Sequence, residues 1–294
     1  MKKPLELLPL FNTFIKESEN GKRLKKNGER ITKSSIVSYK YVFQNLVRFS
    51  EETSFELRVC SILKMNTREL KSEKNYWKKF YKNFTDYMYK KGCYDNYVGS
   101  NIKIIRAFFN YLKEEKDIYT GDFHKKFYVR KEQIDILVLT PEQLKFLIHD
   151  KEFEEKLTST QIKLKDIFVF GCSTGLRFSD IFLLTNKNFE KSNDDWYLKI
   201  KSQKTKVYSF IKLPSYAVHT YLKYKPNNST TTIFGTKNLS NFNRSLKRIG
   251  EIAGFTHEVE TSREKQGVLK KVKQKKDKTL VLFNYLKFIF DLTT

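Results

Sequence analysis

The chain has 294 residues, of which 39% are hydrophobic and 31% charged, and its formal net charge is +24 at pH 7. The apolar content excludes a disordered chain, and the length suits two domains with separate cores. The positive charge indicates a polyanionic partner, because each neutralised phosphate releases condensed counterions. An anionic membrane surface is the competing partner, but no apolar run is long enough to span a bilayer. Lysine enrichment from an AT-rich genome is a third explanation.

The three cysteines lie far apart and form no Cys-x-x-Cys pair: Cys60, Cys93 and Cys172. This spacing predicts free thiols in a reducing compartment rather than a disulfide framework or a zinc site. The basic N-terminus is followed by an apolar run too short for a secretory signal. We therefore expect a cytoplasmic protein, associated with the nucleoid through its charge.

The first 125 residues are predicted to be helical, because apolar residues recur in them at the helical period. Residues 5–18 form the first predicted helix, and the Glu-Asn-Gly sequence that follows ends it. The second helix is expected to begin at Ser34 or Ser35. Its predicted apolar residues include Val37 and Tyr41.

Two further helices complete the predicted bundle. The third covers residues 74–90, with Trp77 and Phe80 on its inner face. A polar segment at 96–100 is expected to separate it from a fourth helix, whose apolar positions begin at Ile102. Four helices of this length form a compact bundle, and none of them carries a catalytic arrangement.

Basic residues lie beside the aromatic ones in the second and fourth helices: Lys40, Arg48, Lys103 and Arg106. Any one of them is compatible with a solvated helix face. In a domain that is basic throughout, the same residues are candidates for contact with DNA phosphates. We therefore take these four as candidate DNA-binding residues.

Residues 126–139 are predicted to form a linker that ends in a strand-like run, Ile-Leu-Val-Leu at 136–139. Thr140 then has the features of a helix N-cap, with Pro141 at the first helical position and Gln143 three residues after the cap. A second domain is therefore expected to begin at residue 140.

The predicted second domain, residues 140–260, mixes helices and strands. Residues 196–201 and 206–213 alternate weakly in polarity and flank Ser-Gln-Lys-Thr at 202–205, which predicts a hairpin. The further predicted helices of this domain lie at 216–224 and 239–253.

The most informative segment is Gly-Cys-Ser-Thr-Gly-Leu-Arg-Phe-Ser-Asp at 171–180. Ser179 and Asp180 are N-cap residue types before an apolar run, so we expect a new helix to start there. Gly175 can take a positive φ at no steric cost, and the turn can therefore aim Arg177 into a cleft. A guanidinium held in this way presents a planar set of donors that suits a phosphate.

This segment closely resembles the first catalytic box of the tyrosine recombinases, the phage-integrase family, in the form common in integrases of mobile elements from Bacteroidetes. The resemblance implies an α+β fold, mainly α with a small β-sheet. It implies a helical, SAM-like core-binding domain over residues 1–125 and an incomplete catalytic domain over 140–260. It extends to about residue 275.

In this family a tyrosine attacks a DNA phosphate and forms a phosphotyrosine bond, without a metal or another cofactor. The resemblance assigns Arg177 to the first catalytic arginine, and a structural ion pair with Asp180 is the alternative. It assigns Lys204 to the hairpin lysine that acts as general acid toward the leaving 5′-oxygen, although two other lysines lie within three residues. Asp180 and Gly175 are expected to support the arginine turn.

The remaining family residues have no match in this sequence. His257 lacks the arginine three residues later that a His-x-x-Arg box requires, and Tyr285 is the only tyrosine after residue 224. Residues 261–294 are predicted to be a basic linker and an atypical tail, as a truncation or frameshift would leave. No nucleophile is therefore assigned.

Two functional hypotheses follow from the resemblance. A recombinase-family protein without its nucleophile would bind double-stranded DNA but not cleave it, alone or beside intact recombinase protomers in a tetrameric assembly. The alternative is a non-catalytic accessory or regulatory DNA-binding protein that retains the integrase scaffold. Both hypotheses predict that this chain alone is inactive and that it has no membrane partner.

Overall fold

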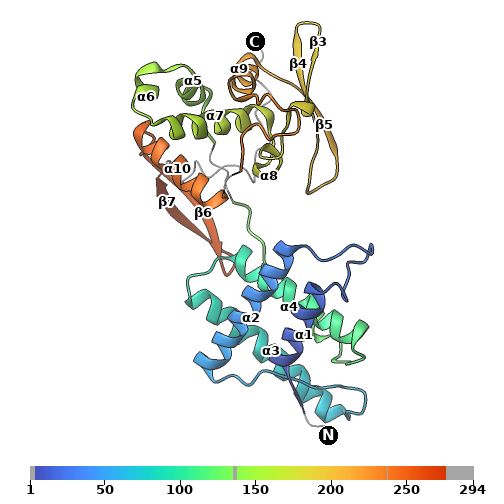
Figure 1. The fold of residues 1–294 in the computed structure, drawn as a ribbon. Coiled ribbons are helices and arrows are strands. Elements are labelled where there is room, and N and C mark those ends of the chain that lie inside the picture. The colour runs from blue at the N-terminus through green and yellow to red at the C-terminus, as the bar shows by residue number, and fades with distance from the viewer. Residues whose placement is uncertain (1–3, 135–137, 237, 276–294) are drawn as a thin grey trace. The chain divides into compact units, whose positions relative to one another are not determined.

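The computed structural model describes residues 4–134, 138–236 and 238–275 (Figure 1). The chain divides into two compact units. The first comprises Met1–Ile134 with Ser262–Lys270, and the second comprises Asp135–Thr261 with Lys271–Thr294. Helices predominate and the sheets are small and antiparallel where their register is defined, which confirms the predicted α+β class.

The first unit is a bundle of long helices around an aromatic core. Its helices are α1 (Leu7–Glu19), α2 (Lys33–Thr53), α3 (Thr67–Lys90), α4 (Asp95–Glu115) and the short 3₁₀ helix η1 (Phe123–Lys126). Strand β1 (Leu5–Glu6) pairs with β2 (Arg58–Val59), so the first predicted helix begins two residues later than expected. Trp77, Phe80 and Phe109 are fully buried in the core.

The start of α2 differs from the prediction. Thr32 caps the helix by accepting the backbone N–H of Ser35 at 3.3 Å, so neither Ser34 nor Ser35 is the cap. Val37 and Tyr41 are exposed, and the prediction that they belong to the apolar face is wrong. The buried face is set by Ile36, Val42, Leu46 and Phe49, whose spacing follows the helical period more closely.

Both later helices of the bundle are longer than predicted. Asn66 and Glu69 form a capping box, which starts α3 at Thr67. Residues 96–100 do not separate two helices but form the first turns of α4. A Cβ at Gly99 would lie 1.9 Å from the carbonyl oxygen of Arg130, so glycine is required there for close packing rather than for a break in the helix.

A hairpin late in the sequence contributes its tip to the first unit. Strands β6 (Glu258–Lys265) and β7 (Val268–Lys275) pair, although we expected a linker from residue 261 on. Gln266 and Gly267 both have positive φ, at 59° and 76°, which is the backbone that a two-residue hairpin turn with type I′ geometry needs. The tip, Ser262–Lys270, belongs to the first unit.

Two buried carboxylates hold this tip. The Arg263 guanidinium donates to both oxygens of Glu132, at 2.8 and 3.1 Å, and the Glu264 N–H donates to one of them at 2.6 Å. The turn N–H groups of Gln266 and Gly267 each donate to Asp95 at 2.8 Å. Because both carboxylates accept several bonds, their burial is compensated.

The second unit surrounds the buried helix α7. Its helices are α5 (Pro141–His149), α6 (Lys151–Glu155), α7 (Ser159–Thr174), α8 (Phe178–Ile181), α9 (Ser215–Tyr224), α10 (Leu239–Ile252) and the 3₁₀ helix η2 (Asn186–Asn188). An antiparallel sheet has the order β3 (Phe189–Ser192), β4 (Asp195–Lys201), β5 (Tyr208–Lys212). Helices α5, α9 and α10 all contact α7, and in Figure 1 the sheet lies on the opposite side of this unit from α5 and α6.

Several predictions for the second unit are confirmed. Thr140 forms the predicted capping box with Gln143, and α9 and α10 cover the predicted helical residues. Of the strand expected at 136–139, residues 136 and 137 lie outside the described residues, and Val138 and Leu139 are not in a strand. Among the residues described, no helix combines the length and apolar character that a membrane span requires.

Removal of Arg263 leaves the Glu132 carboxylate buried with fewer donors. We expect Arg263→Ala to lower the free energy of unfolding of the first unit by about 3 kcal/mol, the cost of breaking a buried pair. Urea titration measures this through the fluorescence of Trp77. Because the chain has only two tryptophans, one in each unit, a Trp196→Phe background isolates that signal.

The control is an exposed ion pair on α3 of the same unit. Lys82 and Asp86 lie 3.1 Å apart, with side chains 77% and 41% exposed, so Lys82→Ala is expected to change stability by less than about 1 kcal/mol. A loss as small as this in Arg263→Ala would contradict the prediction.

Acid should weaken the same contact. Burial opposes the ionisation of Glu132, but the bonds from Arg263 and from the Glu264 N–H outweigh it and lower the pKa of Glu132 below its ordinary 4.5. A lowered folded-state pKa stabilises the fold above the unfolded-state value and loses that contribution as pH falls through the folded-state value. Urea titrations at stepped pH should therefore show a steeper acid loss for the wild type than for Glu132→Gln; identical slopes would contradict this.

Candidate nucleic-acid site at the arginine turn

The arginine turn has the predicted glycine geometry but a different helix start. Gly175 has φ 64° and ψ 13°, and its N–H bonds to the Gly171 carbonyl at 3.0 Å to end α7. The next helix, α8, begins at Phe178 and not after Ser179 and Asp180 as expected. Arg177 occupies the N-cap position with extended backbone. The half-buried Arg177 side chain therefore leaves the chain between two helices.

Arg177 and Asp180 are connected through a serine. Arg177 Nη1 donates to Ser202 Oγ at 3.0 Å, and Ser202 Oγ donates to Asp180 Oδ2 at 3.1 Å. Both Ser202 and Asp180 are buried. Within the described residues no ion pair joins Arg177 directly to Asp180. The aspartate therefore positions the arginine by holding the hydroxyl that accepts from it.

Asp180 also anchors the turn between β4 and β5. The Gln203 N–H donates to Asp180 Oδ1 at 3.1 Å. The turn itself is closed by N–H bonds from Ser202 to the Val207 carbonyl and from Lys206 to the Ser202 carbonyl, both 2.9 Å. One buried carboxylate thus joins the start of α8 to the hairpin predicted from the sequence.

The three candidate lysines occupy different parts of this hairpin. Lys204 lies in the turn, next to the anchored Gln203, and is exposed. Lys201 ends β4, with its ammonium 5.1 Å from the centre of the Tyr208 ring. Lys206 follows the turn with a φ of 58°. Lys201 directly precedes Ser202 and Lys204 directly follows Gln203, so both lysines flank the two residues that Asp180 holds, and Lys206 lies farther along the chain.

Ser202 is the site residue that sequence reasoning missed. The sequence predicts only that it belongs to a hairpin connection, because serine is common in turns. The available signal is its position directly before the Gln-Lys sequence of the hairpin. Its role depends on a contact with Asp180, 22 residues earlier, which no local pattern reveals.

In the first unit, the candidate DNA-binding residues lie on two adjoining helices. Lys40 and Arg48 are exposed on α2, Lys103 is exposed on α4, and Arg106 is half-buried there. Asn45 of α2 links the two helices, donating to the Asn101 side-chain oxygen of α4 at 2.9 Å. Lys40 also pairs with Glu19 at 2.6 Å, an exposed contact that a DNA phosphate could replace.

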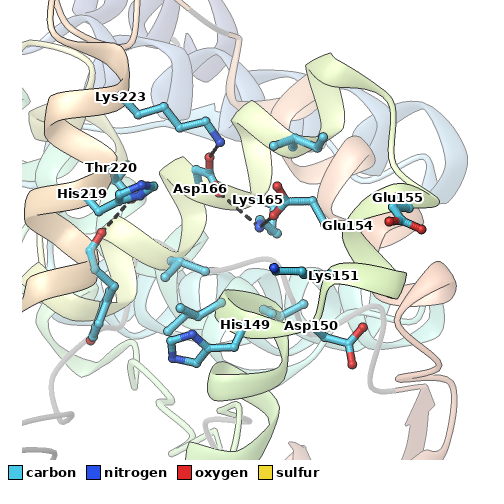
Figure 2. Close-up of a pocket in the computed structure, with 15 residues that line it drawn as sticks. His149, Asp150, Lys151, Glu154, Glu155, Lys165, Asp166, His219, Thr220 and Lys223 are labelled. Carbon is cyan, nitrogen blue, oxygen red and sulfur yellow. Dashed lines mark hydrogen bonds and ion pairs between the residues drawn. The ribbon is translucent and has the colours of Figure 1, made fainter.

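A pocket of about 590 Å³ opens elsewhere in the second unit, between α5, α6, α7 and α9 (Figure 2). Its central charges are already paired. Lys165 forms ion pairs with Glu154 and Asp166, and Lys223 donates to Asp166 at 2.8 Å. Arg177 is not among the lining residues, and the described residues contain no cluster of three potential metal ligands. We therefore place the candidate site at Arg177.

Two histidines and the last tyrosine of the sequence have no contact with Arg177 among the described residues. His257 is exposed just before β6. Tyr285 lies outside the described residues. His124 is buried in the first unit, where its Nε2 lies 2.8 Å from the Asn110 side-chain oxygen.

No protein-family model matches the sequence, and no curated protein matches it significantly. Solved structures do match the fold. A lambda integrase dimer bound to a COC′ core site aligns with TM-score 0.56 and 14% identity, over 85% of this chain and 82% of that one. The XerH site-specific recombinase bound to difH substrate aligns with TM-score 0.53 and 14% identity, over 96% and 85%.

The Tn1549 transposon integrase, in complex with a circular intermediate DNA, aligns with TM-score 0.52 and 12% identity, over 94% of this chain and 84% of that one. Each alignment spans most of both chains, so it includes more than an isolated helical motif. These TM-scores establish a shared fold, and at identities this low they establish the fold alone. The chain therefore has the fold of lambda integrase, XerH and the Tn1549 integrase.

Proposed function

We propose that this chain is a DNA-binding protein of the tyrosine recombinase family, of the type carried by mobile elements of Bacteroidetes. In this proposal Arg177 holds a backbone phosphate of double-stranded DNA. The observation that carries the proposal is the connection from Arg177 through Ser202 to Asp180, because it ties the arginine turn to the hairpin of Lys204. The fold shared with DNA-bound integrases supports it.

The donor capacity of Arg177 suits this role. A guanidinium carries five N–H donors, and within the described residues Ser202 is the one side chain recorded as accepting from it. The other donors can bind two phosphate oxygens as a planar fork. Partial burial strengthens such a contact, since water screens it less. We assign to Lys204, an exposed residue of the turn, the second positive charge at this phosphate and the role of the family's general acid.

The first unit supplies a separate contact with the DNA backbone. Lys40, Arg48, Lys103 and Arg106 lie on α2 and α4, and the chain carries 57 basic against 33 acidic residues. Such residues set register and affinity through phosphates without reading bases. In the lambda integrase structure two protomers share one core site. We propose that further protomers, including those of an intact recombinase, join this chain on DNA.

We infer that this chain binds DNA without breaking it. The sequence has no His-x-x-Arg box after the hairpin, and its last tyrosine, Tyr285, lies in an apolar run unlike the family's tail. Without a nucleophile no phosphotyrosine forms, so the covalent step is lost rather than slowed.

Arg177→Ala should weaken duplex DNA binding about tenfold, the loss of one charge-assisted hydrogen-bonding group. The slope of log affinity against log salt should also become shallower by about 0.9, as one phosphate contact disappears. Fluorescence anisotropy with a labelled duplex measures both quantities. Lys151→Ala is the matched control, because it removes one exposed charge of the same unit at the pocket of Figure 2. Equal effects of the two substitutions would refute the assignment of Arg177.

A nicked duplex that traps covalent intermediates tests the inferred lack of cleavage. We expect no protein–DNA adduct on a denaturing gel, even at protein concentrations that saturate the DNA. An adduct that Tyr285→Phe abolishes would contradict the inference and identify the nucleophile.

A further inference from the structure

The three-stranded sheet of the second unit presents an unusual solvent face. Side chains alternate between the faces of a strand, and Leu198 and Ile200 of β4 point into the core. The opposite, solvent-facing side of β4 and β5 carries three directly paired sets of residues. These are Tyr197 with Lys212, Lys199 with Phe210, and Lys201 with Tyr208, together named here the aromatic–lysine face.

The aromatic rings of this face are available to a partner. Tyr208 is 66% exposed and Phe210 is 63% exposed, both on β5, whose other side is partly buried. Tyr197 and Phe210 stack with their ring centres 4.9 Å apart and their planes within 10°. Stacked rings held by strand pairing form a rigid flat surface. A contiguous patch of exposed aromatic side chains is typical of an interaction site.

Charge along the face favours a polyanion at one end. Two acidic residues lie at the end far from the turn: Glu190 of β3 is directly opposite Tyr197, and Asp195 pairs with Lys212 at 2.6 Å. Toward the turn the exposed charges are all basic, and Lys199, Lys201 and Lys204 follow one another along β4 and the turn. The turn is also where Ser202 accepts from Arg177. Ser202 points to the buried side of the hairpin and Lys201 to the exposed side, so the proposed phosphate site and the basic end of the face lie at the same turn, on its two sides.

Flat aromatic rings interleaved with lysines are the features that bind unpaired nucleotides. Bases stack on the rings while ammonium groups neutralise the backbone. Bases inside a duplex are covered by their neighbours and cannot stack in this way. We propose that the aromatic–lysine face binds unpaired nucleotides of the DNA strand whose phosphate Arg177 holds. This inference rests on the proposed function and adds to it a preference for locally opened DNA.

The test compares two DNAs of equal length, a fully paired duplex and the same duplex with a short internal bubble. We expect the full chain to bind the bubble more tightly. The double substitution Tyr208→Ala with Phe210→Ala should reduce bubble affinity about tenfold and change duplex affinity by less than about twofold, given the size of base–aromatic stacking. Tyr208→Phe with Phe210→Tyr keeps both rings and should retain bubble binding.

Tyr128→Ala is the matched control, since this tyrosine of the first unit is also 66% exposed. Unchanged bubble binding by the double alanine variant would overturn the inference and leave the proposed function intact. Equal losses on both DNAs would overturn it too, since the face would then serve duplex binding. Self-association of the wild-type chain that is lost in the double alanine variant would also overturn the inference, because the face would then bind a second copy of the chain. Failure of the wild type to bind either DNA would refute both proposals.

Discussion

One buried carboxylate, Asp180, holds together the two chain segments that form the candidate phosphate site. It accepts the Ser202 hydroxyl and the Gln203 N–H, which belong to the β4–β5 turn, while itself lying in α8. Without it the buried Ser202 hydroxyl would lose its acceptor, at a cost of about 1–3 kcal/mol. The orientation of Arg177 depends on that hydroxyl, so the electrostatic character of the site depends on Asp180.

The first unit uses the same physical device at another hairpin. Asp95 accepts two consecutive N–H groups of the β6–β7 turn, and Glu132 accepts the Arg263 guanidinium. In each unit a short, polar turn is attached by carboxylates that are removed from water and fully provided with donors. Such contacts specify position closely, because a displaced turn would leave a buried charge without partners. In a chain so rich in lysine, buried acidic residues therefore determine where its basic hairpins lie.

The sequence predicted elements well where the pattern is local. The period of apolar residues located the helices, and Gly175 and Thr140 marked a turn and a cap correctly. Helix starts were missed where the cap, such as Thr32 or Asn66, lies before the apolar pattern begins. The exposed, lysine-rich strands of the β6–β7 hairpin lack apolar alternation, so their sequence predicts a linker and not a hairpin. Its attachment joins Gly267 to Asp95 across 172 positions, a separation that no local pattern encodes.

A double-mutant cycle on duplex DNA binding tests most directly whether Asp180 acts through Arg177. The account predicts that Asp180→Ala and Arg177→Ala each weaken binding, and that the double variant binds little worse than either one, with a coupling energy of at least about 1 kcal/mol. Circular dichroism of each variant establishes that the fold is retained. Additive losses in the double variant would contradict the account, because Asp180 would then contribute to binding independently of the arginine.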